Sequence, residues 1–423
     1  MLFSGPGLLM SMYFTYIEGT YDVDKQKVFI SVSIPVSTYH LTGPLGSIVT
    51  ARLGYRRGMV LGGVLQSCGF VLCAFAPTLV SLDIGLFITG FGCSIIYVGL
   101  ISVVLGEVFQ KNRSLVSAII TSSGSWYVAA YGPLNQMLID HYGWKGSLLI
   151  TAGVTLNIVP FSMLYISTYR SIMSETSKYT EEPQNISKSD DEPKPHGFLA
   201  SIVHYSGIQT LNLYSATVAM ATSFTSVIEN CVSLILIKFA LSIGYTHYEA
   251  VYLQTLYVIV TVVSKFIIGY ITSINPNLQE EEPLLSDATS STGYCTSKCP
   301  MVRRSYVFSA FALMYSLSVL IPIKPTKQSF VAYCVLAGIS SGPLSSTGIT
   351  VAADMFGRDA FQHIFGLRSM LLGINLIAVS VLDGYLIKLP GTFDNEQYLF
   401  CGLAALSAAG VFVTQILWIR NRH

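Results

Sequence analysis

Residues 81–106 read SLDIGLFITGFGCSIIYVGLISVVLG and contain a single charged side chain, that of Asp83. A helix needs about 20 mostly apolar residues to cross the hydrocarbon core of a membrane, so this stretch predicts one membrane span. Stretches of similar length and polarity recur along the chain, at about 1–17, 27–50, 56–77, 114–138, 147–167, 212–237, 249–272, 305–323, 329–352, 363–388 and 397–419. The sequence therefore predicts an all-α membrane protein with twelve transmembrane helices.

The composition supports this prediction and excludes other classes of protein. Hydrophobic residues make up 52% of the chain and charged residues 11%, whereas a soluble domain has about 25% charged residues. Strands of a membrane β-barrel are half as long as these stretches and alternate in polarity, so we expect no barrel. A net charge of +1 predicts no nucleic-acid partner. The sequence has no phosphate-binding loop, catalytic constellation or metal-ligand spacing, so we expect neither an enzyme nor a cofactor.

The positive charges of the loops predict the orientation in the membrane. Arginines gather in the loops after even-numbered spans, for example at Arg52, Arg56, Arg303 and Arg304. The loops after odd-numbered spans carry charges of both signs. Because loops rich in lysine and arginine stay in the cytoplasm, both termini are predicted to be cytoplasmic.

A polar segment at 168–205 divides the spans into two groups of six. It is rich in Glu, Asp, Ser, Lys and Pro and has too few apolar residues to form a core, which predicts a flexible cytoplasmic linker. We expect an N-terminal six-helix bundle at 1–167 and a C-terminal six-helix bundle at 206–423, with a cytoplasmic loop at about 274–303. Two six-helix bundles around a central site are typical of the major facilitator fold.

The loop after the second span contains a regular pattern of glycine and arginine. The sequence reads Gly43-Pro44-Leu45-Gly46 and then Ala51-Arg52-Leu53-Gly54-Tyr55-Arg56-Arg57. A glycine permits a tight turn between helices, and arginines can meet carboxylates or helix C-termini at the cytoplasmic face. We therefore predict a gating motif at Arg52, Gly54 and Arg56. The alternative is that the arginines only fix the orientation of the chain in the membrane.

Several motifs resemble those of the monocarboxylate transporter family of solute carriers. The pattern around Arg52 is one of them. Others are VFQKNRSL at 108–115, Ser123-Gly124-Ser125, Gly132-Pro133 and Tyr142-Gly143-Trp144-Lys145-Gly146. The second half is similar but weaker, with Gly342-Pro343 and Phe356-Gly357. The resemblance covers nearly the whole chain.

The resemblance implies a function. It implies secondary transport, by alternating access, of small monocarboxylates or related organic anions, in some members as symport with protons. It also implies a place in the plasma membrane. The expected partners are a small organic anion, protons, the lipid bilayer and a single-span accessory subunit.

The chain departs from the family at positions that matter for proton coupling. It begins inside the first span, which is therefore expected to be truncated and to lack the family's acidic, glycine- and tryptophan-rich start. Leu8 takes the place of a lysine that proton-coupled members have. Thr261 and Lys265 take the places of their aspartate and arginine in the eighth span. Lys265 keeps a positive charge at the position of the arginine, whereas Thr261 lacks the carboxylate of the aspartate. Proton coupling would therefore need other groups.

Two charged residues inside predicted spans are candidates for function, because such residues usually face a cavity or a partner. Lys265 is predicted to bind the substrate carboxylate, and reaching back to the cytoplasmic surface is the alternative. Glu229 is the candidate for proton or ion coupling, against a neutral structural carboxyl. Counting about 1.5 Å per residue puts Glu229 about 24 Å and Lys265 about 10 Å from the cytoplasmic ends, which predicts two separate sites.

Tyr39 and Arg368 are further candidates for substrate binding. Tyr39 occupies a position that matches the family, and Arg368 lies one or two turns inside the eleventh span, where it lines the pathway or reaches the surface. His40 is expected to be a packing residue.

A sorting motif is a candidate in the loop at 274–303. Glu280, Leu284 and Leu285 form an acidic dileucine pattern. This pattern makes an endosomal or lysosomal membrane the alternative to the plasma membrane.

Two other functions stay open. The missing aspartate and first-span lysine favour a pH-independent facilitator of a neutral or zwitterionic solute. The missing N-terminal motif favours a truncated paralogue or a receptor that does not transport.

Overall fold

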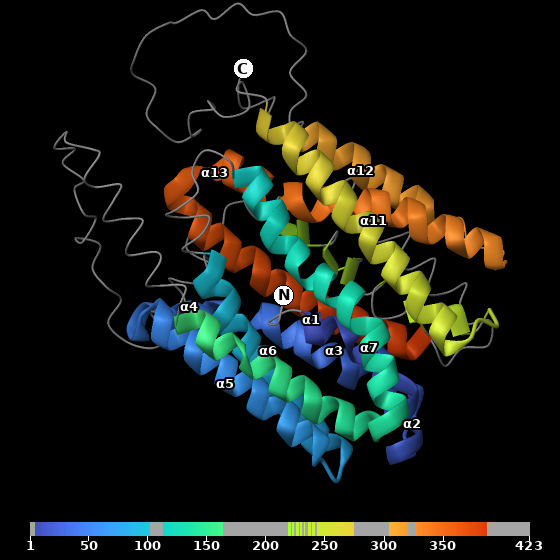
Figure 1. The fold of residues 1–423 in the computed structure, drawn as a ribbon. Coiled ribbons are helices and arrows are strands. Elements are labelled where there is room, and N and C mark those ends of the chain that lie inside the picture. The colour runs from blue at the N-terminus through green and yellow to red at the C-terminus, as the bar shows by residue number, and fades with distance from the viewer. Residues whose placement is uncertain are drawn as a thin grey trace, which may run out of the picture.

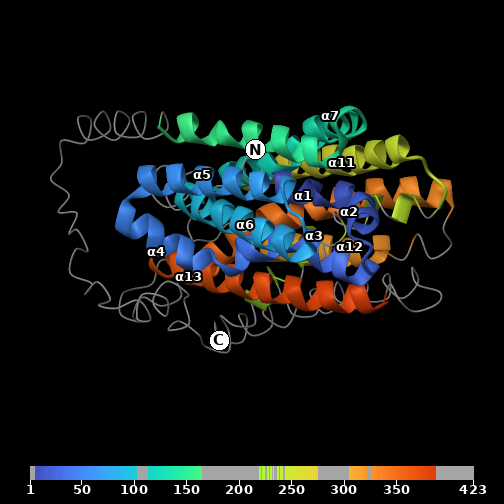
Figure 2. The ribbon, with the colours of Figure 1, turned by 90° about the horizontal axis from the view of Figure 1, so that it is seen from below.

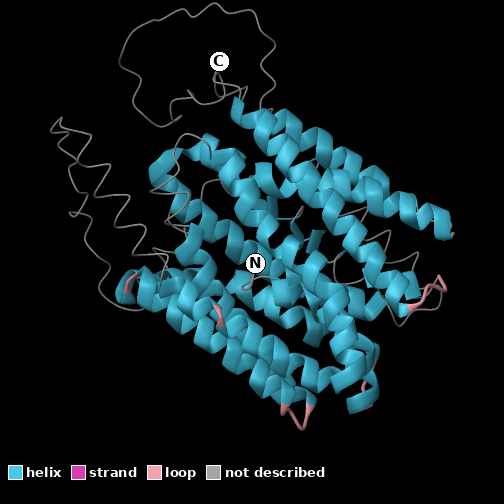
Figure 3. Ribbon diagram, in the orientation of Figure 1, coloured by secondary structure: helices cyan, strands magenta, loops and turns pink. Residues whose placement is uncertain are grey.

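The structure is a computed structural model, and every element that it describes is a helix (Figure 3). The described residues are 5–101, 113–163, parts of 219–241, 243–274, 304–319, 321 and 326–386. Five helical segments of this part of the chain are long and apolar enough to cross a membrane: Tyr55–Ala74, Leu79–Leu100, Ala118–Met163, His247–Ile271 and Lys327–Gly348. We call the described residues up to 163 the first half and those from 219 onward the second half.

The first predicted span consists of three consecutive segments. They are α1 (Gly5–Leu8), the 3₁₀ segment η1 (Leu9–Tyr13) and α2 (Phe14–Tyr21). Asp22 ends α2 with a left-handed backbone at φ 49°, so the helix extends beyond the predicted end at about residue 17.

The second predicted span is broken into α3 (Lys25–Leu41) and α4 (Gly43–Leu53). The break coincides with Pro44, because proline has no N–H to donate to the carbonyl four residues earlier. The third and fourth spans are single helices, α5 (Tyr55–Ala74) and α6 (Leu79–Ile101), and they pack along each other.

The fifth and sixth predicted spans are joined in α7 (Arg113–Leu156), with further helical residues up to 163. Gly143 divides α7 into two limbs, because its backbone at φ 71° and ψ 167° is not helical. A left-handed φ of this kind suits glycine, which has no Cβ to clash. The bend lets the second limb turn back, so one continuous helical element supplies two spans.

In the second half, the seventh predicted span is described in part between 219 and 241. It is followed by α11 (His247–Ile274), α12 (Arg304–Val319) and α13 (Lys327–Leu386). α13 has 60 residues and includes both the tenth and the eleventh predicted spans, which appear as orange and red limbs in Figure 1. The predicted linker, the loop from 275 to 303 and the twelfth span lie outside the described residues.

The two halves pack side by side, chiefly along two pairs of helices. α3 of the first half contacts α13, and the first half's α7 contacts α11 (Figures 1 and 2). The buried core includes large apolar side chains from both halves, such as Phe29 and Phe330. Apolar side chains also cover the outside, among them Phe87 and Ile267, as expected where lipid is the solvent.

Candidate functional site

A cavity of about 150 Å³ lies between the two halves. The first half lines it with α3, α6 and the first limb of α7. The second half lines it with residues around 226–230, with α11 and with α13. A cavity shared by two bundles is where a transporter of the alternating-access type holds its solute.

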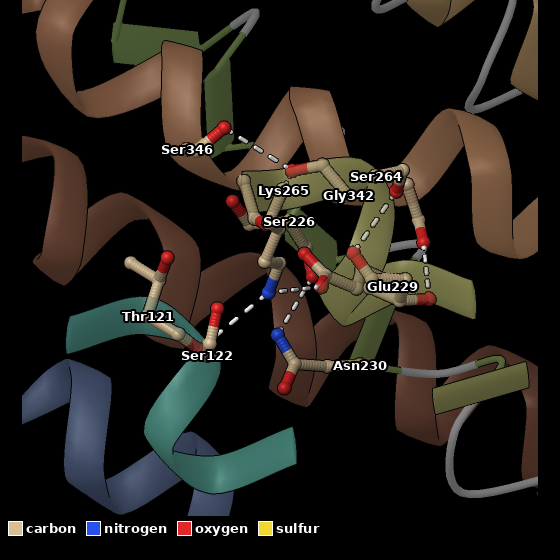
Figure 4. A network of polar contacts seen from close by, with 12 residues as sticks. Thr121, Ser122, Ser226, Glu229, Asn230, Ser264, Lys265, Gly342 and Ser346 are labelled. Atoms are coloured by element: carbon tan, nitrogen blue, oxygen red, sulfur yellow. Dashed lines mark hydrogen bonds and ion pairs between the residues drawn. The ribbon is translucent and has the colours of Figure 1, made fainter. Parts of the chain in front are cut away.

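An ion pair joins Glu229 and Lys265 in this cavity. The Lys265 ammonium lies 3.4 Å from Glu229 Oε1, and the two side chains are 3% and 23% exposed. The same ammonium donates to the carbonyl of Thr121 on α7, at 3.5 Å, and so also touches the first half (Figure 4). The pair keeps the charge of Lys265 compensated, because an unpaired ammonium is costly away from water.

The prediction of separate sites for Glu229 and Lys265 was wrong. The depth of a side chain depends on the true end and the tilt of its helix, and neither can be read from the sequence. α11 continues to Ile274, two residues past the predicted end at 272. Transmembrane helices also tilt by about 20°, and a lysine side chain reaches several Å along its helix, so the side chains meet.

Arg368 enters the same cavity from α13. It is 6% exposed, so it does not reach the molecular surface. Its Nη2 donates to Ser226 Oγ at 2.7 Å and to the carbonyl of Thr222 at 3.4 Å. Its Nε has no hydrogen-bond partner, and no carboxylate of the described residues lies within ion-pair distance. Arg368 is therefore a buried cation whose described hydrogen-bond partners are neutral.

Aromatic side chains from the first half form the opposite wall. Tyr39 and Tyr97 line the cavity with their rings edge to face, 5.0 Å between centroids. The Tyr39 ring also lies 4.1 Å from the ring of His40, which lines the cavity as well. Tyr39 and His40 thus both line the cavity, and the expectation that His40 is a packing residue stays a prediction.

Several lining residues were not among the residues predicted from the sequence. Tyr97, Tyr257 and Asn230 all face the cavity. Tyr257 donates to Ser341 Oγ at 3.3 Å, and Thr261 shares that hydroxyl at 3.1 Å. A polar side chain in the middle of an apolar span is the only signal that marked these positions.

Leu8 and Thr261, the two departures from the family pattern, also line the cavity. Both side chains therefore face the space between the two halves. The cavity wall thus carries an apolar side chain and a hydroxyl at these two positions.

The predicted gating residues lie elsewhere. Gly54 connects α4 to α5 with φ 78° and ψ 155°, a backbone that favours glycine. Arg52 and Arg56 are exposed, and neither makes an ion pair within the described part of the chain. They do not line the cavity, so a gating role for them stays a prediction.

The sorting candidates Glu280, Leu284 and Leu285 lie outside the described residues. Among the residues that are described, no group of three or more His, Cys, Asp or Glu side chains is placed to hold a metal ion.

Comparison with known proteins identifies the family. Residues 2–279 match the Major Facilitator Superfamily. The protein belongs to this superfamily. It is therefore a multi-pass membrane protein and a secondary transporter of a solute, not an enzyme.

Within the superfamily, the chain is similar to monocarboxylate transporters. Monocarboxylate transporter 12 of Mus musculus is 24% identical over 421 residues, which cover 94% of this chain and 79% of the relative. Monocarboxylate transporter 2 of Homo sapiens is 24% identical over 412 residues, which cover 95% and 79%. The predicted resemblance to monocarboxylate transporters is thus confirmed.

The fold is also confirmed. A variant of the E. coli fucose:proton symporter FucP superposes with a TM-score of 0.61 at 14% identity. The match covers 98% of this chain and 97% of that protein. The protein therefore has the all-helical major facilitator fold.

Proposed function

We propose that this superfamily member transports small organic anions, chiefly monocarboxylates, by alternating access of its two halves to the central cavity. The observation that carries the proposal is the charge of the cavity. Its described lining has two cations, Lys265 and Arg368, and one carboxylate, that of Glu229. A bound carboxylate would balance the excess positive charge.

Arg368 is the primary anion contact in this proposal. Lys265 already has a carboxylate partner, whereas the described partners of Arg368 are a hydroxyl and a carbonyl. A guanidinium can hold a carboxylate with two parallel hydrogen bonds, which fixes its orientation as well as its charge. Tyr39 and Tyr97 then face the remainder of a small substrate.

Glu229 is the group through which protons would be coupled. While it is ionised, it holds Lys265. Protonation of Glu229 would end the ion pair and release the Lys265 ammonium toward a substrate carboxylate. Symport of a proton with the anion follows from this exchange of partners.

The location in the cell is part of the same proposal. The arginine-rich loops support a topology with both termini in the cytoplasm. The names of the relatives, monocarboxylate transporters, support a monocarboxylate as the solute. A place in the plasma membrane and a single-span accessory subunit belong to the proposal only as implications of the family resemblance.

Uptake of labelled lactate, pyruvate and a panel of other solutes tests the proposal. The protein is expressed in cells at a measured surface density, and uptake is compared at pH 6 and pH 7.5. We expect saturable uptake of monocarboxylates that is faster at the lower pH. Normal surface delivery without uptake of any carboxylate would contradict the proposal.

Substitution of Arg368 tests the assignment of the anion contact. Arg368→Gln should raise KM about 10- to 100-fold, because a hydrogen bond to a charged group contributes about 1.5 to 3 kcal/mol. Arg368→Lys should have a smaller effect, since it keeps the charge and loses the planar geometry. Lys265→Ala should raise KM less than Arg368→Gln does. The control is Arg57→Gln, an exposed arginine away from the cavity, which should leave KM unchanged.

A second candidate is transport of a zwitterion without pH dependence. The observation in its favour is that Glu229 and Arg368 line the same cavity. A zwitterion could place its carboxylate on Arg368 and its ammonium on Glu229. In that case uptake of amino acids would exceed uptake of lactate, and Glu229→Gln would abolish the former selectively.

A further inference from the structure

The break between α3 and α4 weakens the hydrogen bonding of one backbone carbonyl. In a regular helix the carbonyl of His40 accepts from the N–H of residue 44. That residue is Pro44, which has no N–H to donate. The N–H of Thr42 is shared between the carbonyls of Thr38 and His40, so it gives His40 only part of a bond.

A side chain from the other half supplies a donor. The hydroxyl of Ser369 on α13 donates to the His40 carbonyl at 3.1 Å, and Ser369 is 5% exposed. The His40 ring reaches the same hydroxyl, with Nδ1 3.5 Å from Oγ. A buried carbonyl without a partner costs about 1 to 3 kcal/mol, so this bond stabilises the contact between the halves.

Two glycines let the helices come close enough for this bond. A Cβ at Gly373 of α13 would lie 2.4 Å from the Leu41 nitrogen, closer than real atoms approach. A Cβ at Gly43 would lie 3.3 Å from Ser369 Oγ. Both glycines lie beside the hydrogen bond. A larger residue at either position would push α13 away from the break between α3 and α4.

We propose that Ser369 is a positioning residue, which anchors α13 to the His40 carbonyl and thereby holds Arg368 in the cavity. Ser369 follows Arg368 directly, so the bond fixes the height and rotation of the helical turn that carries the guanidinium. The Gly43-Pro44 motif has a matching role, because the proline leaves the carbonyl open for a donor from the other half. The inference rests on the proposed function only for the substrate that Arg368 binds.

Cysteine labelling tests the position of Arg368 without any substrate. A cysteine is placed at Ser125, which lines the cavity from α7, and is labelled with an anionic and with a cationic thiosulfonate. In the parent, the Arg368 charge should favour the anionic reagent. Ser369→Ala should lower the ratio of anionic to cationic labelling several-fold at equal surface density. An unchanged ratio would overturn the proposal, and the protein without the added cysteine corrects for its other thiols.

Removal of the proline tests the role of the carbonyl. Pro44→Ala restores an N–H at residue 44, which competes with Ser369 for the His40 carbonyl and weakens the anchor. Pro44→Ala alone should therefore lower the labelling ratio, and Ser369→Ala should lower it little further in this background. The matched control is Pro343→Ala, because Pro343 also lacks a backbone N–H but lies inside α13, four residues after a different carbonyl. Pro343→Ala should leave both the ratio and the effect of Ser369→Ala unchanged. An equal effect of the two proline substitutions, or full additivity of Pro44→Ala and Ser369→Ala, would overturn the proposal.

Uptake separates this inference from the proposed function. If the protein transports carboxylates, Ser369→Ala should raise KM about fivefold and leave the maximal rate per surface molecule unchanged. A fall in maximal rate with an unchanged KM would overturn the positioning role. If no carboxylate is transported and the labelling ratio still falls, the proposed function fails and the positioning of Arg368 is supported.

Discussion

At the scale of single residues, Glu229 and Lys265 form a buried pair in which the two partners differ in exposure. The Lys265 side chain is 3% exposed and that of Glu229 is 23% exposed. Removing one partner of a buried pair leaves the other charge without compensation. The partner that reaches water more easily tolerates this loss better, and a carboxyl can also take up a proton. An unpaired Glu229 should therefore destabilise the protein less than an unpaired Lys265.

This asymmetry gives a prediction for stability. Glu229→Gln should destabilise the protein by up to about 3 kcal/mol, and Lys265→Met by clearly less. The stability of the double variant should be close to that of Lys265→Met, because the double variant has no buried charge at either position. The measurement is the apparent midpoint of thermal unfolding in detergent, from the fraction that stays monodisperse after heating. Equal midpoints for the two single variants would contradict this account of the pair.

At the scale of helices, Gly54 sets the turn between α4 and α5. Its backbone angles of φ 78° and ψ 155° lie in a region that is nearly restricted to glycine. A Cβ there would meet no neighbouring atom within 4 Å, so the constraint is the backbone and not the space. The backbone of this turn therefore requires the glycine of the predicted gating motif, independently of any role of Arg52 and Arg56.

Alanine substitution tests this reason. Gly54→Ala should destabilise the protein by about 1 to 3 kcal/mol through backbone strain. The control is Gly153 in the second limb of α7, where a Cβ also meets nothing within 4 Å and the backbone is helical. Gly153→Ala should be neutral or should stabilise by up to about 1 kcal/mol. Thermal midpoints of the two variants decide the matter, and a neutral Gly54→Ala would contradict the strain argument.

At the scale of the whole molecule, the halves are also joined at the end where α7 bends and α11 begins (Figure 1). Asp140 of α7 accepts a hydrogen bond from the Tyr248 hydroxyl of α11, and both residues are exposed. Gln136 donates to Asp140 at 3.0 Å and to the Tyr16 hydroxyl at 3.4 Å. The Asp140–Tyr248 bond joins the two halves, whereas the Gln136 contacts lie within the first half. Rocking of the halves would separate α7 from α11 at this end, so this bond belongs to one conformation of the cycle.

A reversible crosslink tests this movement. Cysteines at Asp140 and Tyr248, joined by a short bifunctional thiosulfonate, should reduce uptake at least tenfold. Uptake should return after reduction, and each single cysteine variant treated in the same way should keep its activity. Full uptake by the crosslinked protein would show that the two helices do not separate at this end.

The sequence alone predicted the helices of the described part of the chain and the family. Each apolar stretch of about 20 residues that falls on described residues is helical, because a chain in lipid must pair its backbone groups within a helix. The breaks were less predictable. Pro44 marks the division of the second span in the sequence. The joining of the fifth and sixth spans in α7 has no such mark, because it depends on how the turn at Gly143 packs.

Only the tertiary structure decided the site. It brings Lys265 to Glu229, places Arg368 in the same cavity and joins Ser369 to His40 across the halves. Hydropathy gives the depth of a residue along one helix, and it takes no account of tilt, breaks or the partners that neighbouring helices bring. The sequence therefore determined which charged residues lie within apolar stretches. The packing of the two halves decided which of them meet, because that depends on contacts between segments far apart in the chain.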